Sequence, residues 1–196
     1  MVKKVQNFSP VKVVRYLLQE HVQKSKVLID ATCGAGYDSL FLAKYAPRAA
    51  SIHGFDIQQI ALCKSAELLT KHGFSSRVEL HLDSYVNFSD YVQGKIDLVI
   101  FNWGYLPGAD KNITTQIEDL QQALPKMLER LNIYGVVCIV SYIGHLAGIK
   151  ENLWLESYLV TLDNKQFNVG KYKLFNHKDR APIIYIIEQV KGESCL

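Results

Sequence analysis

The sequence has few cysteines, and none of them are in the spacing that binds zinc. The four cysteines among the 196 residues lie far apart, at Cys33, Cys63, Cys138 and Cys195. Because there is no C-x-x-C pair, neither a zinc knuckle nor a disulfide framework is expected. This use of cysteine favours a reducing compartment. We therefore expect a cytoplasmic protein that needs no metal.

Long apolar runs are also missing. No stretch approaches the roughly 18 apolar residues that a membrane helix requires, and the start, MVKKVQNFSPVKVV, lacks the apolar core of a signal peptide. The net charge is only +3, with 48% hydrophobic and 21% charged residues, as in ordinary folded proteins. We expect a single domain over residues 1–196, with a basic N-terminal helix within residues 1–26 packed on it.

Strand-like and helix-like segments alternate along the chain. The patterns predict strands at 26–30, 51–57, 77–82, 95–102, 135–143, 167–176 and 182–190. They predict helices from Pro10 to about Val22 and at 37–45, 58–72, 84–91, 114–131 and 150–162, with Pro125 kinking or breaking the helix that contains it. Such alternation predicts an α/β fold, with a parallel sheet covered by helices on both faces. The last two strands have no helix between them and predict an antiparallel hairpin at one edge. A mostly parallel, seven-stranded, Rossmann-like sheet with an antiparallel C-terminal strand is the architecture of class I methyltransferases.

A glycine-rich loop, within LIDATCGAGYDS (28–39), joins the first strand to the next helix. Its glycines, Gly34 and Gly36, allow a tight turn and a close approach of backbone to a ligand. In open α/β sheets ligands bind beyond the carboxyl ends of the strands, which is where this loop lies. A plain strand-to-helix turn would also use glycine, so the loop alone does not establish a ligand site.

Acidic residues stand at the ends of the first three predicted strands: Asp30, Asp56 and Asp83. A carboxylate at Asp56 can accept hydrogen bonds from both hydroxyls of a ribose. A carboxylate at Asp83 can reach an adenine amino group. A glycine loop combined with a ribose acid fits two cofactor classes, the dinucleotides and S-adenosyl-L-methionine (SAM).

The residues of the loop favour SAM over a dinucleotide. The third glycine of the G-x-G-x-x-G pattern is replaced by Ser39. Asp38 in the first helical turn would repel a pyrophosphate. SAM carries a positive sulfonium and a positive ammonium, and both are attracted by acids such as Asp30 and Asp38. We therefore expect SAM as the cofactor.

The fourth strand ends in FNWGYLPGAD (101–110). Amine-directed methyltransferases often carry N-P-P-Y at this place, and this chain has Asn102-Trp103-Gly104-Tyr105. In methyl transfer the protein mainly positions a nitrogen lone pair on the methyl group. The Asn102 carbonyl could orient the amine, and Tyr105 could stack on a planar base. His145, after the fifth strand, could accept a proton from the amine or could only hold its loop.

Basic residues are concentrated in segments 1–26 and 165–180. Lysines and arginines can neutralise phosphates, and the aromatic residues interleaved in the second segment can stack on splayed bases. A solvated face is the simpler explanation of either run taken alone. The two runs together favour an RNA partner.

Five segments, in this order, resemble a family of small bacterial class I methyltransferases: DATCGAGYDS (30–39), FDIQQIA (55–61), FNWGYLPGAD (101–110), YIGHLAG (142–148) and FNHKDRAP (175–182). The resemblance covers nearly the whole chain. Members of this family have been labelled ribosomal RNA methylases. Characterised members methylate the aminomethyl group of 5-aminomethyl-2-thiouridine at the wobble position of transfer RNA.

The resemblance implies functional residues at the matching positions. The implied cofactor-binding residues are Asp30, Gly34, Ala35, Gly36, Tyr37, Asp38, Ser39, Asp56, Gln58, Asp83 and Ser84. The implied catalytic residues are Asn102, Tyr105 and His145, and the implied substrate-binding residues are Gly104, Tyr142, Asn176, His177, Lys178 and Arg180. The chain departs from the family at Ala35 and Tyr37, where asparagine and histidine are usual, at Trp103, where a smaller aliphatic residue is common, and within residues 176–179, which usually read N-Q-K-N.

The resemblance and the residues together predict a SAM-dependent N-methyltransferase. Its substrate would be the anticodon region of transfer RNA, where it would convert aminomethyl to methylaminomethyl on a wobble uridine. Alternatives are the same chemistry on ribosomal RNA or a small amine, an NAD-binding reductase, and a non-catalytic RNA-binding module. The oligomeric state, including a homodimer, stays open at this point.

Overall fold

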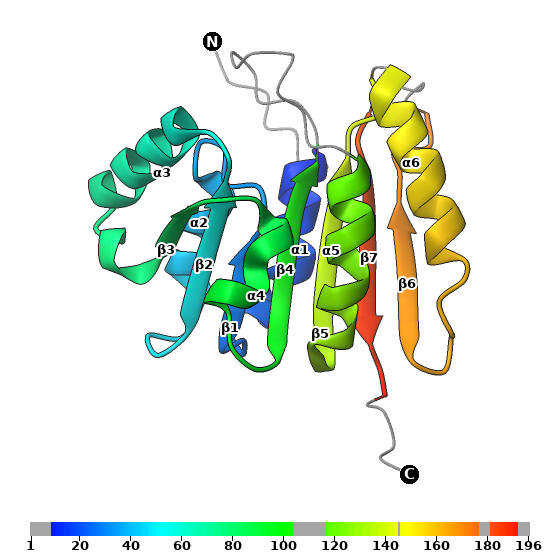
Figure 1. Cartoon of the computed structure of the whole chain (residues 1–196), viewed down its shortest axis with the longest axis horizontal. Helices are drawn as coiled ribbons and strands as arrows, with labels where there is room; N and C mark the ends of the chain where they lie inside the picture. The colour runs from blue at the N-terminus through cyan, green and yellow to red at the C-terminus, as the bar shows by residue number, and fades with distance from the viewer. Residues whose placement is uncertain (1–8, 104–116, 145, 177–180, 192–196) are drawn as a thin grey trace.

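A single sheet of seven strands forms the centre of the fold (Figure 1). The computed structural model of the chain describes residues 9–103, 117–144, 146–176 and 181–191. The strands are β1 (Val27–Asp30), β2 (Ser51–Asp56), β3 (Glu79–Leu82), β4 (Ile96–Trp103), β5 (Leu131–Ser141), β6 (Phe167–Tyr172) and β7 (Ile183–Gln189). Their order across the sheet is β3-β2-β1-β4-β5-β7-β6.

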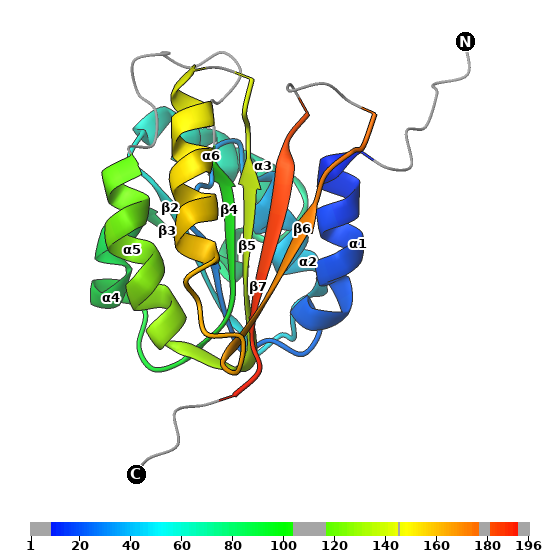
Figure 2. The same ribbon diagram turned by 90° about the vertical axis from the view of Figure 1, so that its right-hand side faces the viewer.

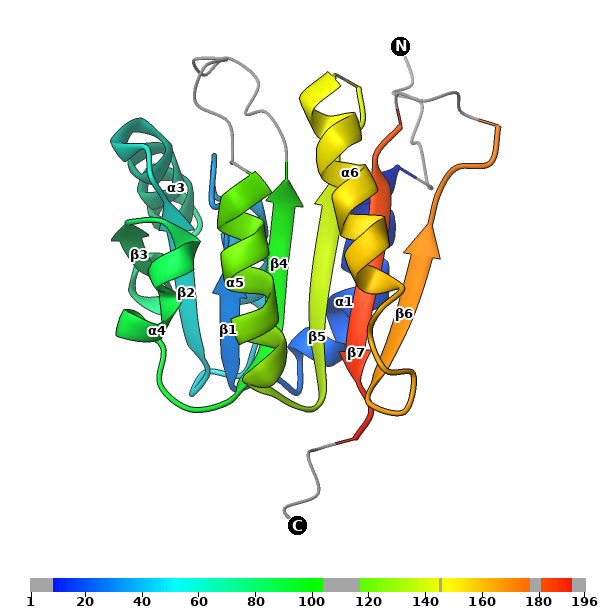
Figure 3. The same ribbon diagram turned by 45° about the vertical axis from the view of Figure 1, so that its right-hand side comes forward.

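The last strand runs against its neighbours. β7 is antiparallel to both β5 and β6, whereas the strands from β3 to β5 pair in parallel (Figure 3). This confirms the predicted mostly parallel sheet with an antiparallel C-terminal strand. The sequence pattern did not specify that β7 would insert between β5 and β6, which leaves β6 at the edge.

Helices cover both faces of the sheet (Figure 2). One face carries α1 (Pro10–Val22), α2 (Tyr37–Tyr45) and α3 (Gln59–Lys71), and the other carries α4 (Phe88–Tyr91), α5 (Ile117–Glu129) and α6 (Leu146–Leu159). Two 3-10 turns, Ser75–Arg77 and Tyr85–Asn87, flank β3. None of the helices within the described ranges is long and apolar enough to cross a membrane.

Burial of the central strands explains why their sequences do not alternate. Four consecutive residues of β4, from Leu98 to Phe101, are at most 1% exposed, because each lies under helices on one face or the other. The N-terminal helix, α1, packs against the sheet through a single stripe of Val14, Leu18 and Val22. The basic N-terminal segment therefore includes a helix that belongs to the core.

Several elements differ from the predictions. The strand predicted at 167–176 ends at Tyr172, and the helix predicted at 84–91 is a 3-10 turn followed by the four-residue α4. Pro125 does not break its helix, since α5 is continuous over Ile117–Glu129 with buried Leu124 and Met127 beside the proline. α6 begins at Leu146, earlier than the predicted 150. β5 begins at Leu131, earlier than the predicted 135, because residues 132–135 form a bulge.

The bulge in β5 has a clear backbone origin. Ile96 pairs with Leu131, but Leu98 already pairs with Val136, so β5 has extra residues at this point. Tyr134 takes a positive φ of 64° within the bulge. Regular pairing with β4 starts at Val136, next to the predicted start.

The fold gathers the predicted strand-end residues at one end of the strands. The carboxyl ends of β1, β2, β3, β4 and β5 all lie on the same side of the molecule (Figure 3). The strand order reverses between β1 and β4, and this switch point is where α/β sheets bind ligands.

Candidate functional site

The loop after β1 is held from both sides by the strands next to it. The Ala31 N–H donates to the Ile100 carbonyl of β4 at 2.9 Å, and the Cys33 N–H donates to the Phe55 carbonyl of β2 at 2.9 Å. The loop therefore lies directly over the switch point. Backbone hydrogen bonds to the neighbouring strands therefore fix the path of the loop without a ligand.

Asp56, at the end of β2, fixes the glycine-rich part of this loop. One carboxylate oxygen accepts from the Gly34 N–H at 2.9 Å, and the other accepts from the Gln58 N–H at 2.9 Å. A carboxylate offers about four acceptor positions, so two are left for a ligand. The half-buried Asp56 can therefore hold the loop and still accept hydrogen bonds from two ribose hydroxyls.

Gly36 is required by the fold itself. It is the N-cap of α2 and has a φ of 81°, in the left-handed region that favours glycine. A Cβ at this position would lie 2.8 Å from the Cα of Ser65 on α3. The second glycine of the motif therefore lets α2 and α3 pack closely, and it is not by itself a sign of a cofactor.

Two of the predicted cofactor residues lie behind the loop. Asp30 and Ser39 are both 0% exposed, and the Ser39 hydroxyl donates to the Asp30 carboxylate at 2.6 Å. The other Asp30 oxygen accepts from the Thr32 N–H at 3.3 Å. Neither side chain is exposed to solvent, and their hydrogen bonds hold the loop from behind.

Asp38 connects the loop to the end of β4. The Asn102 side-chain amide donates a short hydrogen bond to the Asp38 carboxylate. The Tyr142 hydroxyl donates to the Asn102 carbonyl oxygen at 3.4 Å, and the Asn102 N–H donates to the Thr32 hydroxyl at 2.8 Å. Residues predicted separately as cofactor, catalytic and substrate residues thus form one connected network.

The two buried acids create a local excess of negative charge. Burial, together with the charge of Asp38, raises the pKa of Asp30 to about 7. Burial also raises the pKa of Asp38, and this is only partly offset by the Asn102 hydrogen bond and the charge of Arg15. Within the described part of the chain neither acid forms an ion pair. Such a place is suited to a ligand cation.

The predicted adenine end is built differently. The Asp83 carboxylate accepts from the Ser84 N–H at 2.7 Å, the Asn87 amide at 2.9 Å and the Tyr91 hydroxyl at 2.9 Å. The Asn87 hydrogen bond is the main cause of the lowered pKa of Asp83. The Ser84 hydroxyl accepts from the Val86 N–H and caps the turn after β3.

The remaining site predictions fall into two groups. Ala35 is half-buried, and Tyr37 and Asn176 are exposed. The turn that contains Asn176 follows β6, at the same end of the sheet as the carboxyl ends of β1 to β5. The others lie outside the described residues: Gly104, Tyr105, His145, His177, Lys178 and Arg180.

Sequence reasoning missed three residues that shape the site. Thr32 accepts from the backbone of Asn102, Ser65 donates to the Gly34 carbonyl at 3.0 Å, and Arg15 on α1 lies near enough to Asp38 to affect its pKa. Thr32 falls within the glycine-rich loop, so its position in the sequence is a signal for a role at the site. The other two come from distant helices, and no local pattern marks them.

Comparison with known proteins agrees with this geometry. A family model described as "Putative rRNA methylase" matches residues 52–188. A curated relative, the chloroplastic tRNA (mnm(5)s(2)U34)-methyltransferase of Arabidopsis thaliana, is 28% identical over 182 residues. The match covers 88% of this chain but only 66% of that protein, which is therefore substantially longer.

Solved structures of similar chains extend the comparison. A putative rRNA methylase from Clostridium thermocellum is 32% identical, with a TM-score of 0.88 over 92% of this chain and 97% of that one. A putative methyltransferase from Streptococcus mutans, in complex with SAH, is 34% identical, with a TM-score of 0.82 over the same shares of the two chains. The O-methyltransferase TomG from Streptomyces achromogenes, in complex with SAM, is 14% identical at a TM-score of 0.68 over 90% of this chain and 78% of that one, which shows the shared fold alone.

Proposed function

Since the chain belongs to the Putative rRNA methylase family and is a SAM-dependent methyltransferase, we propose that its methyl acceptor is an amine on RNA. The acceptor that we propose is the aminomethyl group of 5-aminomethyl-2-thiouridine at the wobble position of transfer RNA. The Arabidopsis relative, whose name specifies mnm(5)s(2)U34 in tRNA, supports this choice. Because the chain belongs to a methyltransferase family, we set aside the alternatives of an NAD-binding reductase and of a non-catalytic RNA-binding module.

The arrangement of Asn102 is the observation that carries the proposal. Its amide donates to Asp38, and its carbonyl oxygen accepts from Tyr142. A carbonyl oxygen has two lone pairs, so one stays available for an N–H of the acceptor amine. Holding the amine in this way would aim its lone pair at the methyl group, which is the main task of the protein in a displacement at carbon.

The cofactor would lie across the carboxyl ends of β1, β2 and β3. We assign the positive methionine end to Asp38, the ribose to Asp56, and the adenine to the turn of Asp83 and Ser84. Gly34, Ala35, Gly36, Tyr37 and Gln58 would line the path between these points. Asp30 would support the methionine end through the loop, because its own side chain is fully buried.

The substrate side is assigned to the later loops. An aliphatic amine is mostly protonated at neutral pH, so it must lose a proton before it attacks. His145 is the proposed acceptor of that proton, and Tyr105 is the proposed wall of the uridine pocket next to Gly104. Asn176, His177, Lys178 and Arg180 are proposed to contact the RNA, where lysine and arginine neutralise phosphate charge.

Nucleoside analysis of a deletion strain tests the proposed substrate. Mass spectrometry of transfer-RNA nucleosides should show that 5-aminomethyl-2-thiouridine accumulates and that its methylated product disappears. An unchanged transfer-RNA profile would overturn the assignment. The family description names ribosomal RNA, so a loss of methylation in ribosomal RNA instead would identify that RNA as the substrate.

The role of Asn102 can be tested separately on the purified protein. Asn102→Ala should lower kcat roughly 100-fold, because the amine is no longer aimed. It should change the affinity for SAH only a few-fold, since the proposed cofactor contacts remain. Asn168→Ala, at an exposed asparagine of β6, is the matched control and should match the wild type. A variant of Asn102 with near-normal kcat would contradict the proposed role.

A further inference from the structure

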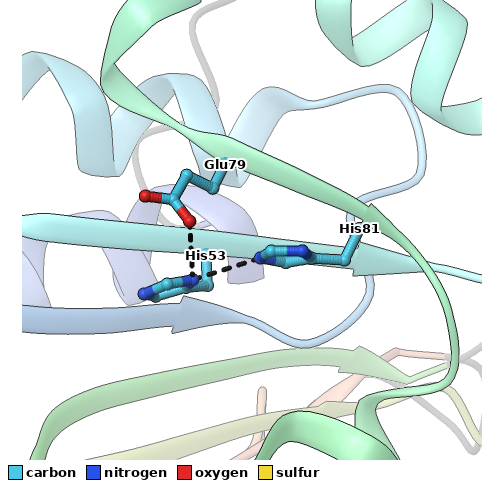
Figure 4. Close-up of side chains that lie close together, drawn as sticks. All are labelled: His53, Glu79 and His81. Carbon is cyan, nitrogen blue, oxygen red and sulfur yellow. Dashed lines mark hydrogen bonds and ion pairs between the residues drawn. The ribbon is translucent and has the colours of Figure 1, made fainter. Parts of the chain in front are cut away.

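Two histidines and a glutamate lie together on β2 and β3 (Figure 4). β3 is the edge strand, and β2 and β1 separate it from β4, which carries Asn102. His53 on β2 pairs in register with Glu79 on β3, and Phe55 pairs with His81. Because side chains two residues apart on a strand share a face, all three titratable side chains project from the same face of the sheet.

The ligand atoms of this cluster are close enough to share one ion. His53 Nδ1 lies 3.1 Å from His81 Nε2 and 3.7 Å from Glu79 Oε2, and all three ligand atoms lie within 4.8 Å of one another. Two tetrahedral ligands at zinc distances lie about 3.3 Å apart. The histidine pair already has nearly this spacing. The Glu79 side chain is 70% exposed and is free to make the small adjustment that remains.

The environment holds the two rings in place. The Nε2 atom of His53 lies 2.8 Å from the Ser51 hydroxyl, so an Nε2–H donated to Ser51 turns the Nδ1 lone pair toward the cluster. This is the outer hydrogen bond that ligating histidines commonly make. The His81 ring stacks on Phe55 at 4.8 Å and packs against Tyr91 at 4.3 Å between ring centroids.

We propose that His53, Glu79 and His81 form a binding site for a borderline divalent transition metal of the Zn²⁺ type. Two imidazole nitrogens and one carboxylate oxygen suit such a metal, whereas Mg²⁺ and Ca²⁺ require mostly oxygen ligands. Binding replaces the hydrogen between the two rings. The proton of neutral His81 moves from Nε2 to Nδ1, so that His53 Nδ1 and His81 Nε2 each donate a lone pair to the metal and both rings stay neutral.

The proposed site has three protein ligands and one position open to water on the Glu79 side, as in zinc sites that are not purely structural. It lies across β2 and β3, so the metal would tie the edge strand to its neighbour. Tyr91 lies between this site and the proposed adenine turn, because its ring contacts His81 while its hydroxyl donates to Asp83. The site is separate from the chemistry of methyl transfer.

Metal titration of the full-length, tag-free, chelator-treated protein tests the site. A Cys63→Ser, Cys195→Ser background removes competing thiols, one of which is exposed at Cys63. We expect one Zn²⁺ per chain by calorimetry and a tetrahedral visible spectrum with Co²⁺. His81→Gln and Glu79→Gln should each weaken Zn²⁺ binding by at least roughly 100-fold.

Matched controls remove the same residue types from exposed positions elsewhere. His72→Gln and Glu67→Gln, on or next to α3, should bind Zn²⁺ like the background protein. Failure of the background protein to bind Zn²⁺, or equal binding by the His81 and Glu79 variants, would overturn the proposal. Glu79→Gln alters an exposed side chain, so a loss of folding is not expected to obscure the result.

Nitrogen NMR of the histidines gives a second readout that does not depend on affinity. Zn²⁺ should shift His53 at Nδ1 and His81 at Nε2, with His53 keeping its Nε2–H. Ser51→Ala should weaken Zn²⁺ binding by about 10- to 100-fold, as is usual when an outer partner is lost. Ligation of His53 through Nε2 would contradict the geometry that is proposed.

Discussion

The two ends of the candidate cofactor site use the same residue type in opposite ways. At the centre of the sheet, Asp30 and Asp38 are buried, and burial raises their pKa values. At the edge, Asp83 is only half-buried; it accepts three hydrogen bonds, and its pKa is lowered. The acids at the centre are short of positive charge, whereas the acid at the edge already accepts three hydrogen bonds.

The difference indicates that the acids at the centre are suited to bind a cation, whereas Asp83 mainly stabilises a turn. A buried carboxylate without a cation costs free energy, and a ligand that supplies positive charge recovers it. A carboxylate that already accepts from a backbone N–H, an amide and a hydroxyl has about one acceptor position left, so a further ligand adds one ordinary hydrogen bond. An acid at a strand end is therefore informative only together with its burial and its partners.

Among the acids of the site, Asp38 should have the largest effect on the affinity for SAH when its charge is removed. Asp38→Asn preserves the shape and an acceptor for Asn102, but it removes the attraction for the methionine ammonium. We expect the affinity for SAH, measured by calorimetry, to fall roughly 10- to 100-fold, the value of a charge-assisted hydrogen bond. Asp90→Asn, at an exposed acid of α4, should have no effect. Wild-type affinity in the Asp38 variant would mean that the centre does not bind the cation.

The loop at the centre should tolerate no side chain at Gly36. Gly36→Ala must take a positive φ and place a Cβ against the backbone of Ser65. Gly73→Ala has a similar φ of 76° but meets nothing within 4 Å, so it measures the strain alone. Urea unfolding should show Gly36→Ala less stable than Gly73→Ala by about 2 kcal/mol. Equal losses would show that α2 and α3 can move apart at no cost.

The pH dependence of stability should also distinguish the two ends. The folded pKa of Asp30 is about 7, above the ordinary 3.8. Between these values the folded protein holds a proton that the unfolded chain has lost, so the stability of the wild type falls as pH rises through this window. Asp30→Asn removes that fall. The stability of Asp30→Asn relative to the wild type should rise by at most about 1.4 kcal/mol per pH unit and level off above pH 7.

Chemical denaturation from pH 4.5 to pH 8 measures this difference. Asp83 has the opposite sign, because its lowered pKa gives a contribution that is lost only as pH falls toward and below 3.8. Asp83→Asn should therefore run parallel to the wild type over the whole range. A stability difference between Asp30→Asn and the wild type that stays constant with pH would contradict the raised pKa of Asp30.

The smallest effect on the cofactor is expected at Asp83. Asp83→Asn loses part of the turn after β3 but no partner for a cation. The affinity for SAH should fall less than about fivefold, within the 0.5–1.5 kcal/mol of an ordinary hydrogen bond. The same calorimetric titration used for Asp38 measures it. A loss at Asp83 larger than the loss at Asp38 would reverse the comparison.

The alternating pattern predicted the parts of the site that depend on the parallel sheet. Strand ends of parallel neighbours meet at one edge, so Asp30, Asp56 and Asn102 were expected near one another. The sequence did not reveal which strands are neighbours, and the hydrogen bond from Asn102 to Asp38 depends on β1 lying beside β4. It also gave no sign that Asp30 would be fully buried, because burial depends on packing from distant helices.

The histidine cluster shows the limit of local patterns most clearly. His53 and His81 are 28 residues apart, and their contact depends on the register of β2 and β3. Metal motifs are recognised by short spacings on one element, and these residues have none. In the same way, the lack of a zinc motif led to an expectation of no metal, which the proposed site would revise.

Reconstitution of the reaction from purified components tests the proposed methylation of transfer RNA. The purified protein would be incubated with SAM and with transfer RNA that carries 5-aminomethyl-2-thiouridine, and the nucleosides would be analysed by mass spectrometry. We expect the wild type and Asn168→Ala to convert it to 5-methylaminomethyl-2-thiouridine, and Asn102→Ala to do so about 100-fold more slowly. An intact aminomethyl nucleoside, with methyl groups transferred to another RNA or to a small amine, would contradict it.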